Sequence, residues 1–397
     1  MDYDIVVSGG GIAGLSATAA FAAAGFSTLC VDPAPPVTER EADGADLRTT
    51  AFLQPAQAFL DEIGLWPRLA GHATPLQIMR IVDAGGPVPE PRVTRDFDAA
   101  DISDKPFGWN LPNWLLRREM AARLTDLAKA DFRPGIAATG LFTRDGEARV
   151  SLSDTTRVRC RLVVAADGRG SPMRAAAGIG VKTTRFGQKA LAFAVTHPIP
   201  HGNVSTEIHR TGGPFTLVPL PDYEGRPCTA VVWMEDGTKA ERLFALDPAT
   251  FEAEMSERSC HLFGPLTLAS RRTIWPIIAQ EAERLSGQRL ALVAEAAHVV
   301  PPIGAQGLNM SLKDIACLRD LALARPEGLG DVQMLDAYHK ARIADIRTRV
   351  AGITALNRIS QISSEPLRDI RAKGLDALYS LKPVRTTLMR LGLGASG

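Results

Sequence analysis

Residues 5–14 have the sequence IVVSGGGIAG, and this stretch decides the fold. Its first half is a short apolar run typical of a buried parallel strand, and its second half carries the glycine pattern GxGxxG. A strand that turns directly into a helix through these glycines is typical of a dinucleotide-binding βαβ unit. We expect Gly9 to permit the tight turn, Gly11 to let a pyrophosphate approach the backbone, and Gly14 to allow close packing of the helix on the strand.

The residues that follow complete this unit. An alanine-rich stretch at 12–24 predicts a helix closed by Gly25, and residues 28–31 predict a second strand that ends at Asp32. The N-terminus of the helix would offer free N–H groups and a partial positive charge to the phosphates. Asp32 is placed to accept hydrogen bonds from an adenosine ribose, so the unit predicts a dinucleotide site.

Two segments far along the chain also look suited to a cofactor. Residues 161–166 predict a buried strand that stops at Asp167, and residues 290–293 predict another that leads into the loop at 294–309. An NAD-dependent dehydrogenase would instead place its catalytic domain after a contiguous Rossmann half. The cofactor domain is therefore expected to be assembled from separated segments.

The chain between these segments has a different residue pattern, which is typical of β-strands. Residues 190–195, 215–220 and 229–233 predict strands separated by turn residues. The predicted fold class is α/β: a discontinuous Rossmann-like cofactor domain, an inserted and mostly antiparallel β-sheet domain for the substrate, and a helical C-terminal tail. The expected bounds are 1–77, 105–180 and 281–331 for the cofactor domain, 78–104 and 181–280 for the substrate domain, and 332–397 for the helical region.

Composition and charge exclude several classes of function. A formal net charge of +1 provides no field that would attract nucleic acid, and no basic stripe with aromatic residues occurs. The five cysteines are scattered without a CxxC pair, which predicts reduced thiols, and no metal-ligand spacing is found. The acidic start of the chain is unlike a secretory signal, and there is no apolar run of about 18 residues. We therefore expect a cytoplasmic protein.

Taken together, the motifs resemble those of the flavoprotein monooxygenases of the p-hydroxybenzoate hydroxylase fold, and most closely the ubiquinone-biosynthesis hydroxylases. That family has GxGxxG, a DG motif, and a GD motif that leads into a Pro-x-x-Gly-Gln-Gly-x-Asn loop, and all three have counterparts here in the same order. Residues 46–51 resemble its D-x-R-x-x-A segment, and residues 213–220 and 231–233 resemble parts of its inserted sheet. The similarity covers nearly the whole chain.

The resemblance implies FAD as the cofactor, and it assigns roles by position. Asp32 would hold the adenosine ribose, while Arg48 and Arg117 would lie near the pyrophosphate or the flavin. Asp167 belongs to the DG motif, and Pro302 would pack beside the isoalloxazine ring. The predicted cofactor-binding residues are Gly9, Gly11, Ile12, Ala13, Gly14, Asp32, Arg48, Arg117, Asp167, Glu295, Pro302, Gly307, Leu308 and Asn309.

One departure from the family pattern stands out. Where the family has Gly-Asp, this chain has Ala294 and Glu295. The aspartate of the family binds the ribityl hydroxyls, and glutamate keeps the carboxylate but adds one methylene. We expect FAD binding to be weakened or altered by this change. The alternative that it marks a member of the family without flavin is left open.

The implied reaction is hydroxylation of the aromatic ring of a polyprenylated phenol or quinone precursor in ubiquinone biosynthesis. NAD(P)H would bind transiently to reduce the flavin, and O2 would form the C4a-hydroperoxide that transfers the hydroxyl group. No protein nucleophile or metal is needed because the cofactor carries the chemistry, although Pro302 and Arg48 are candidates beside the ring. Pro219 and Leu220 are candidates for an apolar cavity lining. His298 is expected to be a structural hydrogen-bonder rather than a base.

Several alternatives remain at this point. The tail from Glu365 mixes leucines with arginines and lysines, which predicts either an amphipathic helix at the inner face of the membrane or a helix packed on its own domain or a partner subunit. A homo-oligomer and contacts with other ubiquinone-biosynthesis proteins are further expectations. The rival functions are a soluble-phenol hydroxylase, a prenyl-lipid reductase, and a non-catalytic scaffold subunit of a quinone-synthesis complex.

Overall fold

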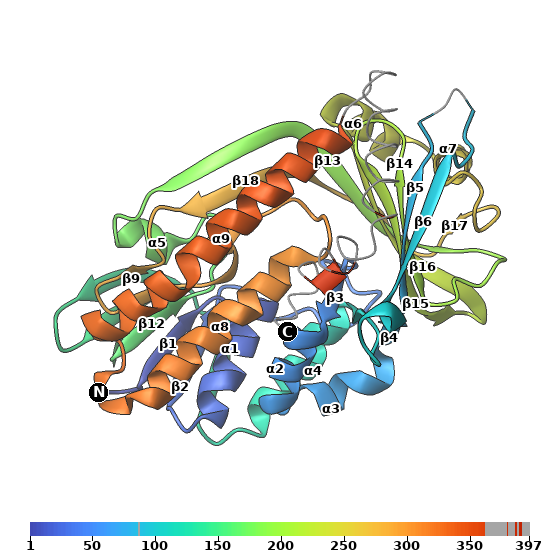
Figure 1. Cartoon of the computed structure of the whole chain (residues 1–397). Helices are drawn as coiled ribbons and strands as arrows, with labels where there is room; N and C mark the ends of the chain where they lie inside the picture. The colour runs from blue at the N-terminus through green and yellow to red at the C-terminus, as the bar shows by residue number, and fades with distance from the viewer. Residues whose placement is uncertain (86–87, 362–378, 380–385, 387–388, 391–397) are drawn as a thin grey trace.

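Two large β-sheets organise the protein, and helices connect and cover them (Figure 1). The computed structural model describes residues 1–85 and 88–361, together with residues 379, 386, 389 and 390. Helix α9 (Val332–Ser360) runs from the first sheet towards the second, so the far end of the described chain contacts both.

The first sheet contains the predicted βαβ unit. Its strand order is β19-β20-β12-β1-β2-β8, and all neighbours are parallel except β19 and β20. The strands are β1 (Ile5–Ser8), β2 (Thr28–Asp32), β8 (Ala130–Pro134), β12 (Leu162–Ala165), β19 (Ser286–Gly287) and β20 (Leu290–Leu292). β1 lies at the centre and is buried throughout, which explains its continuous apolar run. The segments at 161–166 and 290–293 thus join β1 in one sheet, as predicted.

Helices cover this sheet. α1 (Ile12–Ala23) packs against α4 (Asn113–Thr125) and α8 (Gln306–Ala324). α1 ends where Gly25 adopts a φ of +93°, a conformation that favours glycine. Because α1 is rich in alanine, neighbouring elements can approach it closely, and most of its residues are buried.

The second sheet is mostly antiparallel, as predicted. Its order is β21-β18-β13-β16-β15-β14-β5-β6, with β17 on β13, and only the β14–β5 pair is parallel. The strands are β5 (Ile78–Asp83), β6 (Val93–Asp98), β13 (Val181–Thr196), β14 (Val204–His209), β15 (Pro214–Tyr223), β16 (Arg226–Asp236), β17 (Thr267–Leu268), β18 (Thr273–Ala282) and β21 (His298–Val299). The early segment β5–β6 therefore joins strands that lie more than a hundred residues later.

The two faces of the second sheet differ in side-chain size. On β13, Leu191 and Phe193 face a core closed by α6 (Gly237–Ala245) and α7 (Pro248–Arg258). The alternate residues Ala190 and Ala194 belong to other clusters, on the face towards the first sheet. On β13 the smaller side chains therefore lie on the face opposite α6 and α7.

Smaller elements complete the described chain. They are β3 (Thr49–Leu53), α2 (Gln54–Glu62), α3 (Trp66–Leu69), β4 (Thr74–Leu76), β7 (Gly108–Pro112), β9 (Ala138–Thr143), β10 (Ala148–Leu152), β11 (Arg157–Cys160) and α5 (Pro172–Ala176). Four short 3₁₀ turns lie between them, of which η2 (Ala99–Asp101) and η3 (Ala294–Ala296) bear on the site. Within the described ranges, no helix is long and apolar enough to cross a bilayer.

Two local predictions were wrong. Residues 51–63 have a pattern that predicts a helix, but the segment begins as strand β3, because it pairs with β7, and the helix starts only at Gln54. The strand-like region at 181–275 contains helices α6 and α7, which begin after Asp236 and Asp247. Both aspartates accept hydrogen bonds from backbone N–H groups of the first turn, a capping signal that the sequence carries. The tail predictions from Glu365 fall almost entirely outside the described residues.

Candidate cofactor site

The glycine turn has the geometry that phosphate binding needs. Gly9 has a φ of +105°, and a Cβ there would lie 2.4 Å from the carbonyl oxygen of Ala166. A Cβ on Gly14 would lie 1.8 Å from the carbonyl oxygen of Gly9. By contrast, a Cβ on Gly11 would meet no atom of the described chain within 4 Å. Gly9 and Gly14 are therefore required by packing, whereas Gly11 borders open space.

Helix α1 begins directly after this turn. Its N-cap is Gly11, no side chain of the described residues caps it, and its first turn has no acidic residue. The first N–H groups of the helix therefore keep their hydrogen-bonding capacity for an anion. Asp32 accepts from Gly10 N at 2.6 Å and from Ala34 N at 2.9 Å, so its carboxylate fixes the turn. A bond from Asp32 to a ribose remains a prediction.

A charged cluster forms around Asp46. Arg48 donates two hydrogen bonds to its carboxylate, at 2.8 and 2.7 Å, and Asn113 Nδ2 donates a third at 3.0 Å. Arg117 Nη2 lies 3.8 Å from the same group. Burial alone would raise the pKa of Asp46, but these donors outweigh it and the pKa is lowered. The predicted residues Arg48 and Arg117 thus converge on an aspartate that the prediction had not assigned to the site.

Arg48 also connects this cluster to the rest of the site. The bidentate bond to Asp46 raises the pKa of Arg48, and the charge of Glu295 adds to this effect. Its guanidinium carbon lies 5.6 Å from the centre of the Trp275 ring on β18. Trp275 is half-buried, whereas Trp233 is buried in the core. Arg48 and Glu295, which are far apart in sequence, therefore influence each other electrostatically.

Asp167, of the DG motif, lies beside the glycine turn. Its Oδ2 accepts from Ser8 Oγ at 3.3 Å and from Met173 N at 3.2 Å. Its Oδ1 is buried and has no hydrogen-bond partner among the residues described. Burial raises the pKa of Asp167. A buried acceptor without a donor is unfavourable, so a ligand hydroxyl or water would complete this position.

The DG motif is tied to the loop after β20. Ser171 Oγ accepts from Arg174 N at the start of α5, and buried Arg174 donates to the carbonyl oxygen of Ala296 at 2.8 Å. In that loop Ala294 has a φ of +55°, a region that favours glycine, and it is buried. Glu295 is exposed. The backbone at residue 294 thus retains the glycine-type conformation that the family pattern suggests, although the residue is alanine.

The loop at 302–309 turns into α8. Gly304 and Ala305 have left-handed φ values of +64° and +56°, and within the described chain no side chain caps the helix. Its N–H groups are therefore available near Gly307 and Leu308. The side chain of Asn309 accepts from Leu53 N and donates to the carbonyl oxygens of Ala51 and Ala305. It fixes β3 against the start of α8, and only its backbone remains for a cofactor.

His298 is a structural residue, in agreement with the prediction. Its Nε2 lies 2.6 Å from Asp314 Oδ2, and Arg342 Nε donates to the other carboxylate oxygen at 2.8 Å. Arg342 also donates to Asp345, which pairs with Arg349. The first three side chains are buried. This network joins the loop after Glu295 to α8 and α9, so it holds one wall of the site in place.

These contacts bring the predicted segments together. Asp167 bonds to Ser8, Arg174 to Ala296, and Asn309 to Leu53, so the turn, the DG motif and both loops share one region. The open position at Gly11, the unpartnered oxygen of Asp167 and two uncapped helix N-termini fit a phosphate-bearing, hydroxyl-rich cofactor such as FAD.

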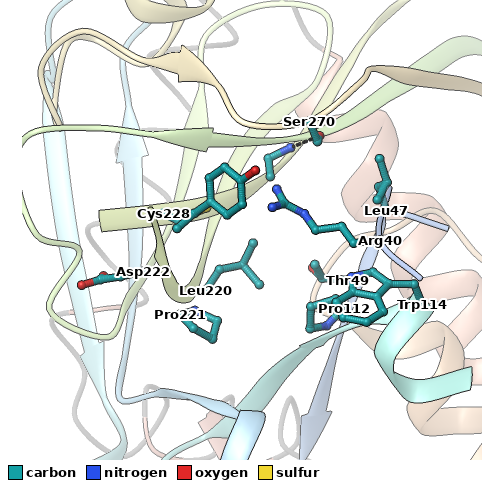
Figure 2. Close-up of a pocket in the computed structure, with 12 residues that line it drawn as sticks. Arg40, Leu47, Thr49, Pro112, Trp114, Leu220, Pro221, Asp222, Cys228 and Ser270 are labelled. Atoms are coloured by element: carbon teal, nitrogen blue, oxygen red, sulfur yellow. Dashed lines mark hydrogen bonds between the residues drawn. The ribbon is translucent and has the colours of Figure 1, made fainter. Parts of the chain in front are cut away.

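A cavity of about 140 Å³ lies between the second sheet and the segments around β3 and β7 (Figure 2). Leu220 and Cys228 line it from the sheet, and Leu47 and Trp114 from the opposite side. Arg40 lies over the ring of Tyr223, with 3.7 Å between the guanidinium carbon and the ring centre. The lining confirms the expectation for Leu220. Pro219 is buried behind it and accepts a hydrogen bond from Asn110 through its carbonyl oxygen.

Comparison with known proteins gives a consistent picture. The family model described as an FAD binding domain matches residues 2–351. The ubiquinone hydroxylase UbiL of Rhodospirillum rubrum is 32% identical over 394 residues, which cover 98% of this chain and 89% of the relative. The 3-demethoxyubiquinol 3-hydroxylase of Escherichia coli K12 is 24% identical and covers 98% of both chains.

Solved structures agree on the fold. The p-nitrophenol 4-monooxygenase PnpA from Pseudomonas putida DLL-E4 superimposes with a TM-score of 0.79 at 19% identity and covers 98% of both chains. PqsL of Pseudomonas aeruginosa in complex with 2-aminobenzoylacetate has a TM-score of 0.78 at 20% identity, over 94% of this chain and 99% of that one. These similarities agree with the resemblance that the three motifs indicated.

Proposed function

We propose that this chain, which belongs to the FAD binding domain family together with the ubiquinone hydroxylases, hydroxylates the aromatic ring of a polyprenylated phenol. The reaction would use FAD as cofactor and NAD(P)H and O2 as co-substrates. One observation carries the proposal: the structure combines a backbone cradle for phosphate at Gly11 with an apolar cluster of the second sheet, at Ala190 and Met234, against which Ile303 of the loop before α8 packs. The first feature suits the cofactor, and the second suits a hydrophobic ring.

The residues of this chain would bind and orient the cofactor, which supplies the redox chemistry when bound. Gly11 and the first N–H groups of α1 would hold the pyrophosphate, and Asp32 the ribose. Glu295 would accept from the ribityl hydroxyls, and the buried oxygen of Asp167 would accept from a hydroxyl group close to the turn. The uncapped start of α8 would stabilise negative charge on the flavin pyrimidine.

Pro302 and Arg48 are proposed to lie beside the ring. Pro302 is exposed at the start of the loop before α8, and Arg48 is held by Asp46. The apolar cavity at Leu220 and Trp114 would receive part of the prenyl chain and exclude water. The division of the chain into cofactor and substrate domains at the predicted bounds belongs to the same proposal.

A polyprenyl substrate partitions into the bilayer, so we also propose that the protein works at the inner face of the membrane beside other ubiquinone-biosynthesis proteins. Two tail residues that the structure describes contact the protein's own chain. The rings of Tyr379 and Phe97 are 5.4 Å apart, and Met389 is buried with Ala99 and Phe107. These contacts favour the packed interpretation of the tail. Unchanged flotation on liposomes after removal of residues 362–397 would show that membrane contact lies elsewhere.

The test uses protein that has been loaded with FAD and freed of excess cofactor. We expect a short-chain prenylated phenol to accelerate NAD(P)H consumption, with one oxygen atom from isotope-labelled O2 in the product. Consumption that yields a reduced lipid without labelled oxygen would indicate a prenyl-lipid reductase. Protein that takes up no FAD would support the scaffold alternative, which Ala294 and Glu295 keep open.

A further inference from the structure

Two titratable side chains on β14 have no role in the site described so far. Ile208 packs into the core beneath α7, and side chains alternate along a strand, so Glu207 and His209 point to the opposite face. That is the face on which Ala190 and Ala194 lie. His209 Nε2 is 2.7 Å from Glu207 Oε1, and the exposed fraction of each side chain is 16%. Their register partners on the neighbouring strands are Asp83 and Ile81 on β5 and Pro214 and Thr216 on β15, so this part of the face carries both polar and apolar side chains.

The pair leaves one hydrogen-bond acceptor unused. A carboxylate can only accept, so the tautomer of the neutral imidazole that fits this contact carries its proton on Nε2 and donates to Glu207. Nδ1 then has a free lone pair. This atom is buried and has no partner within the described part of the chain. Because a buried acceptor without a donor is unfavourable, the position suits a ligand that brings a hydroxyl group.

Sheet register places this acceptor near the cofactor loop. His209 pairs with Pro214 on β15, and β15 pairs with β16, which carries Met234. Met234 and Ala190 form a cluster against which Ile303 packs, directly after Pro302. β14 is two strands from β16, so the spacing between strands puts His209 about 10 Å across the sheet from this contact. That span accommodates one aromatic ring.

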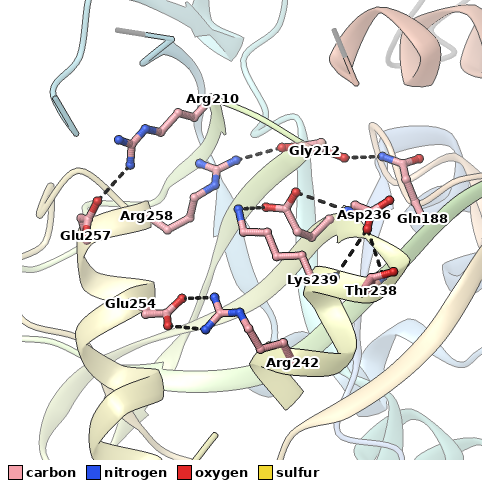
Figure 3. Close-up of polar contacts among 12 residues, drawn as sticks. Gln188, Arg210, Gly212, Asp236, Thr238, Lys239, Arg242, Glu254, Glu257 and Arg258 are labelled. Carbon is pink, nitrogen blue, oxygen red and sulfur yellow. Dashed lines mark hydrogen bonds and ion pairs between the residues drawn. The ribbon is translucent and has the colours of Figure 1, made fainter. Parts of the chain in front are cut away.

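Figure 3 shows Gln188 and Arg258 at the turn around Gly212, which follows β14. Gln188 on β13 donates from Nε2 to the carbonyl oxygen of Gly212 at 2.6 Å. Arg258 on α7 donates from Nη2 to the carbonyl oxygens of Gly213, at 2.8 Å, and Ile208, at 3.1 Å. Asn357 near the end of α9 donates to Gln188 in turn. The turn after β14 is therefore fixed, and the orientation of His209 is defined before any ligand binds.

We propose that Nδ1 of His209 accepts a hydrogen bond from the ring hydroxyl of the phenolic substrate; this rests on the proposed function. The proton of that hydroxyl passes to Nδ1, and the electron pair of the O–H bond stays on the oxygen. The ring becomes richer in electrons, which favours attack on an electrophilic oxygen. Glu207 keeps the imidazole in the required tautomer and stabilises the imidazolium that forms.

The test compares two probes on FAD-loaded protein: a short-chain prenylated phenol and its methyl ether, which cannot donate a hydrogen bond. Binding is followed by the change in the flavin spectrum. We expect wild type to prefer the phenol about tenfold. His209→Phe should bind both probes equally, and its kcat for the phenol should fall about a hundredfold with less change in KM. Exposed His72→Gln serves as the control and should match wild type.

A second variant, Glu207→Gln, keeps the side-chain size. It tests the same contact if His209→Phe fails to fold. It should retain FAD affinity and thermal stability but lose most of the preference for the phenol. A wild type that does not distinguish the probes, or a His209→Phe variant that still prefers the phenol, would overturn the proposal. Wild type that prefers the phenol through His209 but yields no hydroxylated product would instead refute the proposed function and leave the contact in place.

Discussion

At the scale of single residues, two glycines of the turn have different roles: Gly14 is required by packing, and Gly11 leaves space for a ligand. A Cβ on Gly14 would lie 1.8 Å from a backbone oxygen, whereas one on Gly11 would meet nothing in the described chain. We predict that Gly14→Ala lowers the free energy of unfolding by about 3 kcal/mol. Gly11→Ala should fold normally but bind FAD at least about tenfold more weakly, because the methyl group occupies the phosphate position. Urea unfolding and FAD titration measure the two effects, and equal loss of stability in both variants would contradict this assignment.

Glu295 permits a second test at this scale. The side chain is exposed, so its removal should leave the melting temperature of the cofactor-free protein unchanged. Glu295→Ala should nevertheless weaken FAD binding about tenfold, because an acceptor for the ribityl hydroxyls is lost. Glu295→Asp should bind FAD at least as tightly as wild type, since it restores the family residue. If Glu295→Ala binds FAD like wild type, the carboxylate does not contact the cofactor.

Asp167 predicts a dependence of stability on pH. Burial raises its pKa in the folded state above the ordinary value of 3.8, so folding favours the protonated form. Wild type therefore loses stability as pH rises from below 3.8 through the raised value, and the loss persists at neutral pH. We predict that cofactor-free Asp167→Asn is more stable than wild type at pH 7 and that the difference shrinks in acid. A difference that grows in acid would have the wrong sign.

At the scale of elements, the His298–Asp314–Arg342 network fixes the cofactor loop to α8 and α9. Asp314 is fully buried and bonds to both partners. Asp314→Asn should therefore lower the free energy of unfolding by about 3 kcal/mol, because buried Arg342 loses the charge of one of its two carboxylate partners. The exposed pair of Arg242 and Glu254 is the control, and Glu254→Gln should change stability by less than about 1 kcal/mol. Chemical denaturation of both variants measures the two changes in the free energy of unfolding. Equal changes would contradict a stabilising role of the buried network.

The elements also show how far the sequence could be interpreted. The glycine turn and the strands at 161–166 and 290–293 were predicted because their signals are local. Asp46 and Trp275 could not be assigned to the site, since only tertiary packing brings them to Arg48. The side-chain contacts of Asn309 with Leu53 and Ala51 could not be predicted for the same reason. His209 could not be predicted as a site residue, because its position depends on the register of β14 against strands that follow later in the chain.

At the scale of the whole molecule, the site lies where two sheets meet. The first sheet supplies the glycine turn and the DG motif, and the second contacts the loop before α8 through the apolar cluster of Ala190, Met234 and Ile277, against which Ile303 packs. α9 spans both, with Arg342 in the buried network and Asn357 bonded to Gln188. A cofactor bound at this junction would add contacts to the folded state only, so FAD should raise the unfolding temperature.

The most direct test of this account is an absorbance spectrum of the purified protein after FAD has been added and the excess removed. The cradle at Gly11, the free oxygen of Asp167 and the carboxylate of Glu295 predict the visible flavin bands, with one FAD per chain. The Gly11→Ala variant, treated in the same way, should lose most of this absorbance. Colourless wild-type protein that takes up no FAD would contradict the account and would mean that the change to Ala294 and Glu295 has abolished the cofactor site.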